Sequence, residues 1–134
     1  MSKTLSIVIP TYNEAANLPQ VVPLLMESVK EKIWQVIFVN DGSKDESLQI
    51  LQDFQKMYDF KIVHNKVNKG YGGAIKAGIE EATTDLVITI DADGQHSIAD
   101  VQKLYDYLLE KNADMIVGQR PDSSSGAYRR LGKN

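Results

Sequence analysis

Apolar and polar residues follow two alternating patterns along this chain. Short apolar runs of strand length occur at 5–9, 36–39, 86–90 and 115–117, and a weaker one occurs at 61–64. Between them, apolar residues recur every three or four positions, as they do in amphipathic helices, whereas continuous apolar runs are typical of strands buried on both faces. This alternation of strand and helix predicts an α/β fold, a parallel sheet flanked by helices.

Local signals mark the ends of several of these elements. Pro10 is expected to end the first strand and to stiffen the turn after it. Asn17 is a candidate N-cap for the first helix. Ser43 and Glu46 have the spacing of a capping box for the second helix, whose apolar positions would extend to Met57.

Composition is that of a globular domain of ordinary size. Of the 134 residues, 43% are hydrophobic and 25% are charged, which suffices for one sizeable core. The net charge of -3 gives no electrostatic argument for nucleic-acid binding. The absence of cysteine excludes disulfides and thiolate chemistry. The apolar run near the N-terminus is too short for a signal sequence or a membrane span, so we expect a cytoplasmic location.

The most informative stretch lies where the fourth apolar run ends. Residues 86–90 lead into Asp91 and Asp93, two carboxylates one residue apart at the carboxyl end of an expected buried strand. Ligands of open α/β sheets bind at that edge. Two neighbouring acids repel each other unless a cation or a proton lies between them, and Mg²⁺ bound to substrate phosphates would satisfy both. The stretch therefore predicts a metal–phosphate site; the alternative is a polar turn that only caps the next helix.

Three more loops follow strands and are expected at the same edge. Residues 10–14 offer an aromatic face and a carboxylate that would suit a nucleobase, or they simply start a helix. Asp41 could accept a hydrogen bond from a base or a ribose, or it could serve only an Asp-Gly turn. In the glycine-rich loop 68–74, Lys69 and backbone N–H groups could approach a phosphate. Close helix–sheet packing at Gly72, Gly73 and Gly78 explains the glycines equally well.

Taken together, these motifs resemble the family 2 glycosyltransferases of the GT-A fold. The strings P-T-Y-N-E, V-N-D-G-S, N-K-G-Y-G-G-A, D-A-D-G-Q-H and G-Q-R occur in the order seen in that family. Within it the chain looks most like the polyprenol-phosphate sugar transferases, the dolichol-phosphate mannosyltransferase group, from Ser6 to about Leu131. The resemblance implies a Rossmann-like, mostly parallel sheet. It also implies inverting transfer of a sugar from a GDP- or UDP-linked donor to a polyprenyl phosphate, with Mg²⁺ or Mn²⁺.

The motifs and the resemblance together give a set of candidate site residues. The residues expected to bind the donor are Pro10, Tyr12, Glu14, Val39, Asp41, Lys69, Gly70, Asp91, Ala92, Asp93, Gln95, Arg120 and Arg129. Asp91 and Asp93 would be catalytic, and with Gln95 they would hold the metal ion. A lipid phosphate is already anionic, so transfer to it would need little help from a general base; His96 could be one, or could orient the metal site.

The resemblance also bears on domain organisation. Residues 1–120 are expected to form the nucleotide-sugar-binding domain. Residues 121–134 would be a mobile basic tail that completes no element and begins a missing acceptor-side region. Because the family's catalytic domain normally extends further, we expect this chain to bind donor without transferring sugar. The full-length protein would meet the cytoplasmic face of a membrane through the missing regions.

Two other functions stay open at this stage. In a haloacid-dehalogenase-type phosphatase an apolar strand also ends in D-x-D-G, and Asp91 would then be the nucleophile. That motif normally opens its domain, however, whereas here it stands late in the chain. The second alternative is a regulatory domain that binds a nucleotide without turning it over.

Overall fold

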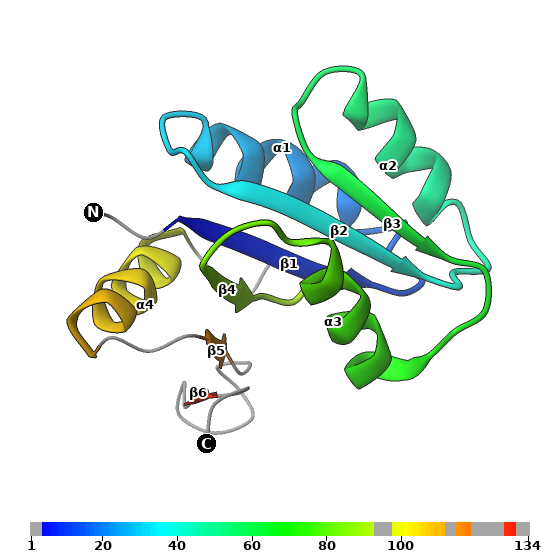
Figure 1. The fold of residues 1–134 in the computed structure, drawn as a ribbon. Coiled ribbons are helices and arrows are strands. Elements are labelled where there is room, and N and C mark those ends of the chain that lie inside the picture. The colour runs from blue at the N-terminus through cyan, green and yellow to red at the C-terminus, as the bar shows by residue number, and fades with distance from the viewer. Residues whose placement is uncertain (1–3, 93–97, 112–114, 119–127, 131–134) are drawn as a thin grey trace.

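The computed structural model describes residues 4–92, 98–111, 115–118 and 128–130. In chain order the elements are β1 (Leu5–Thr11), α1 (Leu18–Val29), β2 (Gln35–Asp41), α2 (Ser47–Gln55), β3 (Lys61–Asn65), α3 (Gly70–Glu81), β4 (Leu86–Thr89), α4 (Ile98–Lys111), β5 (Met115–Gly118) and β6 (Tyr128–Arg130). The predicted alternation of strands and helices through β5 is confirmed (Figure 1).

The six strands of the described residues form one sheet in the order β3-β2-β1-β4-β5-β6. Every neighbouring pair is parallel except β5 and β6. The strand order reverses at β1, because the chain first builds outward to β3 and then crosses back to add β4 on the other side. The predicted α/β class is confirmed, and the reversal leaves a crevice at the carboxyl ends of β1 and β4.

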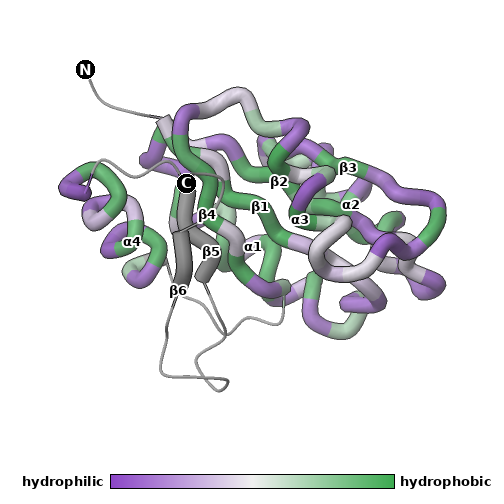
Figure 2. Tube along the Cα trace, turned by 60° about the horizontal axis from the view of Figure 1, so that its bottom comes forward, coloured by the Kyte–Doolittle hydropathy of each residue, from purple (hydrophilic) through white to green (hydrophobic). Residues whose placement is uncertain are grey.

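Helices cover both faces of the sheet. On one face α1, α2 and α4 pack over a large hydrophobic cluster that includes Ile7, Phe38 and Ile88. On the other face lies α3 (Figure 1), over a smaller cluster that includes Val8 and Val39. The central strands are hydrophobic along most of their length, whereas the outer helices and loops are mixed (Figure 2). Burial on both faces is the reason for the continuous apolar runs in the sequence.

Close helix–sheet packing explains one of the glycines of α3 but not all of them. A Cβ at Gly78 would overlap Val8 and lie 3.0 Å from Cγ2 of Val39, so the absence of a side chain lets α3 approach the sheet. A Cβ at Gly72 would meet nothing within 4 Å. The packing interpretation therefore holds for Gly78 and is wrong for Gly72.

Pro10 does not end β1, contrary to the prediction. The strand continues to Thr11, with Pro10 opposite Val39 of β2. On its other side β1 pairs with β4 only as far as Val8. Pro10 therefore lies beyond that ladder, where its missing N–H removes no hydrogen bond to β4.

The predicted start and end of α2 are also wrong. The helix begins at Ser47, and Glu46 at the N-cap makes no side-chain capping bond. The Ser43 hydroxyl instead accepts a hydrogen bond from the backbone N–H of Asn13, in the preceding β–α loop. Met57 lies beyond the end of the helix and is 70% exposed, so it is not part of its apolar face.

The expectation that residues 121–134 complete no element is wrong for Tyr128–Arg130. These residues form β6, whose backbone pairs antiparallel with β5 from Ile116↔Arg130 to Gly118↔Tyr128. A short polar segment carries no strand periodicity of its own. Its pairing depends on the open backbone edge that β5 presents.

Candidate functional site

A pocket of about 380 Å³ opens at the carboxyl edge of the sheet. Its lining residues are Pro10, Thr11, Tyr12, Glu14, Asp41, Asn68, Gly70, Tyr71, Ala74, Asp91 and Ala92. They come from the end of β1 and the segment after it, from the last residue of β2, from the segment after β4, and from the loop before α3 and the first turns of that helix. The four motif-bearing loops of the sequence thus meet at one edge, at the point where the strand order reverses.

The predicted site residues fall into four groups. Pro10, Tyr12, Glu14, Asp41, Gly70, Asp91 and Ala92 line the pocket. Val39 and Lys69 do not: the Val39 side chain is fully buried in the core under α3, and the Lys69 side chain is exposed. Asp93, Gln95, His96 and Arg120 lie outside the described residues. Arg129 belongs to β6, where only its backbone is described.

Four lining residues were not among the predicted site residues: Thr11, Asn68, Tyr71 and Ala74. Each stands beside or inside a motif that the sequence analysis had singled out. Asn68 lies two residues before Gly70, at which α3 begins, and Tyr71 directly follows it. A polar and an aromatic residue at a helix start beside the sheet edge could have indicated both.

Asp41 is held at the pocket by residues from β3 and from the loop after it. Its Oδ1 accepts hydrogen bonds from Asn65 Nδ2 at 3.0 Å and from the backbone N–H of Lys69 at 2.9 Å. Asn68 Nδ2 donates to the Asp41 carbonyl oxygen at 3.0 Å. Asp41 is only 3% exposed, so these bonds fix a carboxylate that is nearly withdrawn from bulk water.

The turn after β2 packs directly against the loop that follows β3. Gly42 has φ +71°, in the left-handed region, and a Cβ there would overlap the backbone of Asn68. Asn68 Oδ1 also accepts a hydrogen bond from the N–H of Gly70, which has φ +84°. Glycine is needed at position 42 for both its conformation and its contact, and this contact holds the two loops together beside Asp41.

A second set of bonds joins the loops after β1 and β2. Backbone N–H groups of Asn13, Glu14 and Ala15 donate to Ser43 Oγ, Ser47 Oγ and Asp45 Oδ2 at 2.9, 2.9 and 3.1 Å respectively. In return, Asn13 Oδ1 accepts from the N–H of Lys44 at 2.8 Å. These bonds order the backbone directly after Tyr12, which lines the pocket.

This contact between loops changes the pKa of the Asp45 carboxyl. Burial raises the pKa of the Asp45 carboxyl. Hydrogen bonds from the hydroxyl and N–H of Ser47 and from the N–H of Ala15 outweigh that effect, and they hold the pKa below its ordinary value of 3.8. The charged form of Asp45 therefore helps to join the two loops.

Asp91 lies directly after β4 at the edge of the pocket and is half-buried. Tyr71, from the first turn of α3, places its hydroxyl oxygen 3.5 Å from Asp91 Oδ1. Within the described parts of the chain, no group of three or more His, Cys, Asp or Glu residues is placed to hold a metal ion. Asp91 nevertheless supplies a hard oxygen donor of the kind that Mg²⁺ and Mn²⁺ prefer, so the described part of the predicted ligand set fits such an ion.

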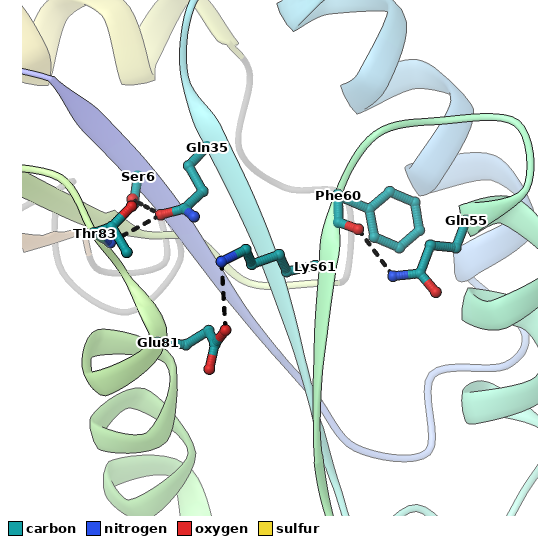
Figure 3. A network of polar contacts seen from close by, with 7 residues as sticks. All are labelled: Ser6, Gln35, Gln55, Phe60, Lys61, Glu81 and Thr83. Carbon is teal, nitrogen blue, oxygen red and sulfur yellow. Dashed lines mark hydrogen bonds and ion pairs between the residues drawn. The ribbon is translucent and has the colours of Figure 1, made fainter.

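A larger pocket, of about 550 Å³, lies at the amino edge of the sheet. Several polar groups there bond to one another. Gln35 Oε1 accepts hydrogen bonds from Ser6 Oγ at 2.7 Å and from the N–H of Thr83 at 3.1 Å, and Lys61 pairs with Glu81 at 3.5 Å (Figure 3). Open α/β sheets bind ligands at their carboxyl edge. The smaller pocket, which lies at that edge, is therefore the better candidate for the ligand site.

Sequence comparison identifies the family. The pattern of the family described as "Glycosyl transferase family 2" matches residues 6–132. The chain belongs to this family. Membership confirms the resemblance inferred from the motifs, and it gives no support to the phosphatase alternative.

Curated members of the family include longer proteins that this chain resembles in part. It is 32% identical over 133 residues to an undecaprenyl-phosphate 4-deoxy-4-formamido-L-arabinose transferase of Pectobacterium carotovorum, covering 96% of this chain and 40% of the relative. It is 29% identical over 141 residues to a dolichyl-phosphate beta-glucosyltransferase of Trichomonas vaginalis, covering 96% and 44%. The chain therefore spans less than half the length of these relatives.

Solved structures share the fold at lower sequence identity. A mannosyltransferase from Pyrobaculum calidifontis, in complex with GDP-Man and Mn²⁺, matches with a TM-score of 0.70 and 19% identity over 92% of this chain and 37% of its own. TarS 1-349 of S. aureus, in complex with UDP, matches with a TM-score of 0.65 and 20% identity over 84% and 34%. These similarities confirm the GT-A fold. Among the described helices of this family member, none is both long and apolar enough to cross a membrane.

Proposed function

We propose that this chain is the donor-binding part of a glycosyltransferase that moves a sugar from a nucleoside-diphosphate sugar to a polyprenyl phosphate. The observation that carries the proposal is the pocket at the carboxyl edge, where four loops of a family 2 domain meet. The names of the relatives support the acceptor, because they are transferases to undecaprenyl phosphate and dolichyl phosphate. Complexes of the structural neighbours with UDP and with GDP-Man support the donor class.

The pocket offers different chemistry to each part of such a donor. Tyr12 supplies an aromatic face and Asp41 a fixed carboxylate at the end assigned to the nucleobase, with Glu14 available to the ribose. Gly70 begins α3, so its end of the pocket presents the amino end of a helix to the diphosphate, with Lys69 adjacent. Asp91 lies in the segment after β4, where it would meet the phosphates through a metal ion.

A divalent ion, Mg²⁺ or Mn²⁺, would be held by Asp91, Asp93 and Gln95. When bound, it would stabilise the negative charge that develops on the departing nucleoside diphosphate. Arg120 and Arg129 would approach the donor diphosphate or the phosphate of the lipid acceptor. Because that acceptor is a membrane lipid, we place the full-length protein at the cytoplasmic face of a membrane.

Ligand-dependent stabilisation tests the donor and metal parts of the proposal. Thermal unfolding should be measured with UDP-, GDP- and dTDP-sugars, with and without Mg²⁺ or Mn²⁺. A ligand at one hundred times its dissociation constant adds roughly 2.7 kcal/mol of stability, which is readily detected. We expect Asp91→Asn and Asp93→Asn to lose the metal-dependent part of this gain. Asp59→Asn, an exposed change of equal charge, should keep it. Unchanged metal dependence in both site variants would contradict the metal assignment.

Transfer itself is tested with the full-length protein. Incubation with labelled donor and polyprenyl phosphate should give a labelled lipid product. Donor binding without any turnover would instead identify a regulatory nucleotide-binding domain.

A further inference from the structure

The hydrogen bonds around Asp41 leave its carboxylate with one open oxygen. Oδ1 accepts two hydrogen bonds, from Asn65 Nδ2 at 3.0 Å and from the Lys69 N–H at 2.9 Å. A carboxylate oxygen has two lone-pair directions, so these two donors fill it. No hydrogen bond from the described part of the chain reaches Oδ2, although Asp41 lines the pocket. Only Oδ2 is therefore offered to a ligand.

The surroundings prevent the carboxylate from turning to offer both oxygens. Asp41 and Asn65 lie opposite each other at the ends of β2 and β3 and are 3% and 6% exposed. The Asp41 carbonyl is held by Asn68, whose backbone in turn packs against Gly42. Rotation of the Asp41 side chain would break both hydrogen bonds and leave the buried amide of Asn65 without its acceptor.

Nucleobases differ in the donors that they present to such a carboxylate. Uracil and thymine present a single imide N–H between two carbonyl groups. Guanine presents a ring N–H and an exocyclic amino group side by side, a pair that matches both oxygens of one carboxylate. Against Oδ2 alone, the imide is fully satisfied, whereas guanine would leave one N–H without its partner, and an unpaired buried donor weakens binding.

We infer that Asn65 is a positioning residue for Asp41, and that the pocket consequently selects a nucleoside diphosphate with a uracil- or thymine-type base over one with guanine. The inference rests on the proposed function, because it takes the pocket as the donor site. It goes beyond that proposal by naming the class of base and a residue, outside the pocket lining, that determines it.

Calorimetric titration of the 134-residue chain in the presence of Mn²⁺ tests the base preference. The ligands are UDP, dTDP, GDP, pyrophosphate and 3-methyl-UDP, in which a methyl group replaces the imide hydrogen. We expect UDP and dTDP to bind at least about tenfold more tightly than GDP, and 3-methyl-UDP at least about tenfold more weakly than UDP. GDP binding as tightly as UDP, or 3-methyl-UDP binding like UDP, would overturn the inference and leave the donor proposal standing. Failure of every nucleotide to exceed pyrophosphate would overturn both.

The role of Asn65 is tested by the ratio of the two affinities. In Asn65→Ala one of the two bonds to Oδ1 is gone, and the UDP-to-GDP ratio should fall to about threefold or less while pyrophosphate affinity is unchanged. Gln49→Ala, an exposed amide removed from α2, is the matched control and should keep the ratio. An unchanged ratio in folded Asn65→Ala would contradict the positioning role. If that variant does not fold, the 3-methyl-UDP comparison on the unaltered chain still decides the base preference.

Discussion

Gly78 of α3 lies so close to Val8 of β1 that a methyl group on the glycine would overlap the valine side chain. The same methyl group would stand 3.0 Å from Cγ2 of Val39 on the neighbouring strand. The missing side chain thus sets how deeply α3 rests on the sheet. It thereby also sets where the first turn of the helix, with Tyr71, meets the pocket.

Replacing this glycine should destabilise the protein even though alanine is the better helix former. We expect Gly78→Ala to lower the free energy of unfolding by about 1–3 kcal/mol, because the added methyl group overpacks the contact with Val8. Denaturant unfolding measures the change. Gly72→Ala is the matched control: its Cβ would meet nothing within 4 Å, and the helix should gain up to about 1 kcal/mol. Equal effects of the two substitutions would contradict the packing account.

Loss of the Asp41 carboxylate should weaken binding of the whole nucleotide but not of its phosphates. We expect Asp41→Ala to cost on the order of 1.5–3 kcal/mol in nucleotide binding, the usual range for a hydrogen bond to a charged group. Titration with nucleotide and with pyrophosphate plus Mn²⁺ separates the two contributions. Asp41→Asn keeps the side-chain shape and serves as the control for a folding defect in Asp41→Ala. Equal losses for both ligands would place Asp41 away from the base.

The contact between Asp45 and Ala15 should weaken in acid. A carboxyl whose folded pKa lies below its unfolded value stabilises the fold above that unfolded value, and the stabilisation is lost as the pH falls through the folded pKa. The pKa of Asp45 is lowered from 3.8, so the Tm difference between the unaltered chain and Asp45→Asn should be complete at neutral pH and shrink as the pH falls below 3.8. Thermal scans across this range provide the measurement. A Tm difference that does not depend on pH would contradict the assignment.

The order of the elements could be predicted because it depends on local periodicity, and the edge that carries the site followed from the parallel strands. What the sequence could not predict depends on partners far along the chain. Pro10 stays within β1 because β4 stops pairing at Val8. Ser43 does not cap the helix that follows it, because its hydroxyl binds Asn13, 30 residues earlier.

In the candidate site, too, some features follow from the local sequence and others depend on residues far along the chain. The carboxylates and glycines of the site could be predicted because the local sequence shows both their residue types and their positions after apolar runs. The hydrogen bond that occupies one oxygen of Asp41 could not be predicted in this way. Its donor, Asn65, lies 24 residues downstream and comes into contact only when β2 and β3 pair in register. Nothing in the sequence around Asp41 indicates that one of its oxygens is already used.

The position of β1 in the sheet affects how the protein must be made. Leu5 of β1 pairs with Leu86 of β4, which is synthesised 81 residues later. At ordinary elongation rates roughly 4–16 s separate the synthesis of the two residues. Until β4 has been made, the edge of β1 that pairs with it has no partner, and such an open apolar edge is a hazard for association with other chains. Asp91 is synthesised only after β4, so the growing polypeptide cannot complete its ligand pocket before this late strand has docked.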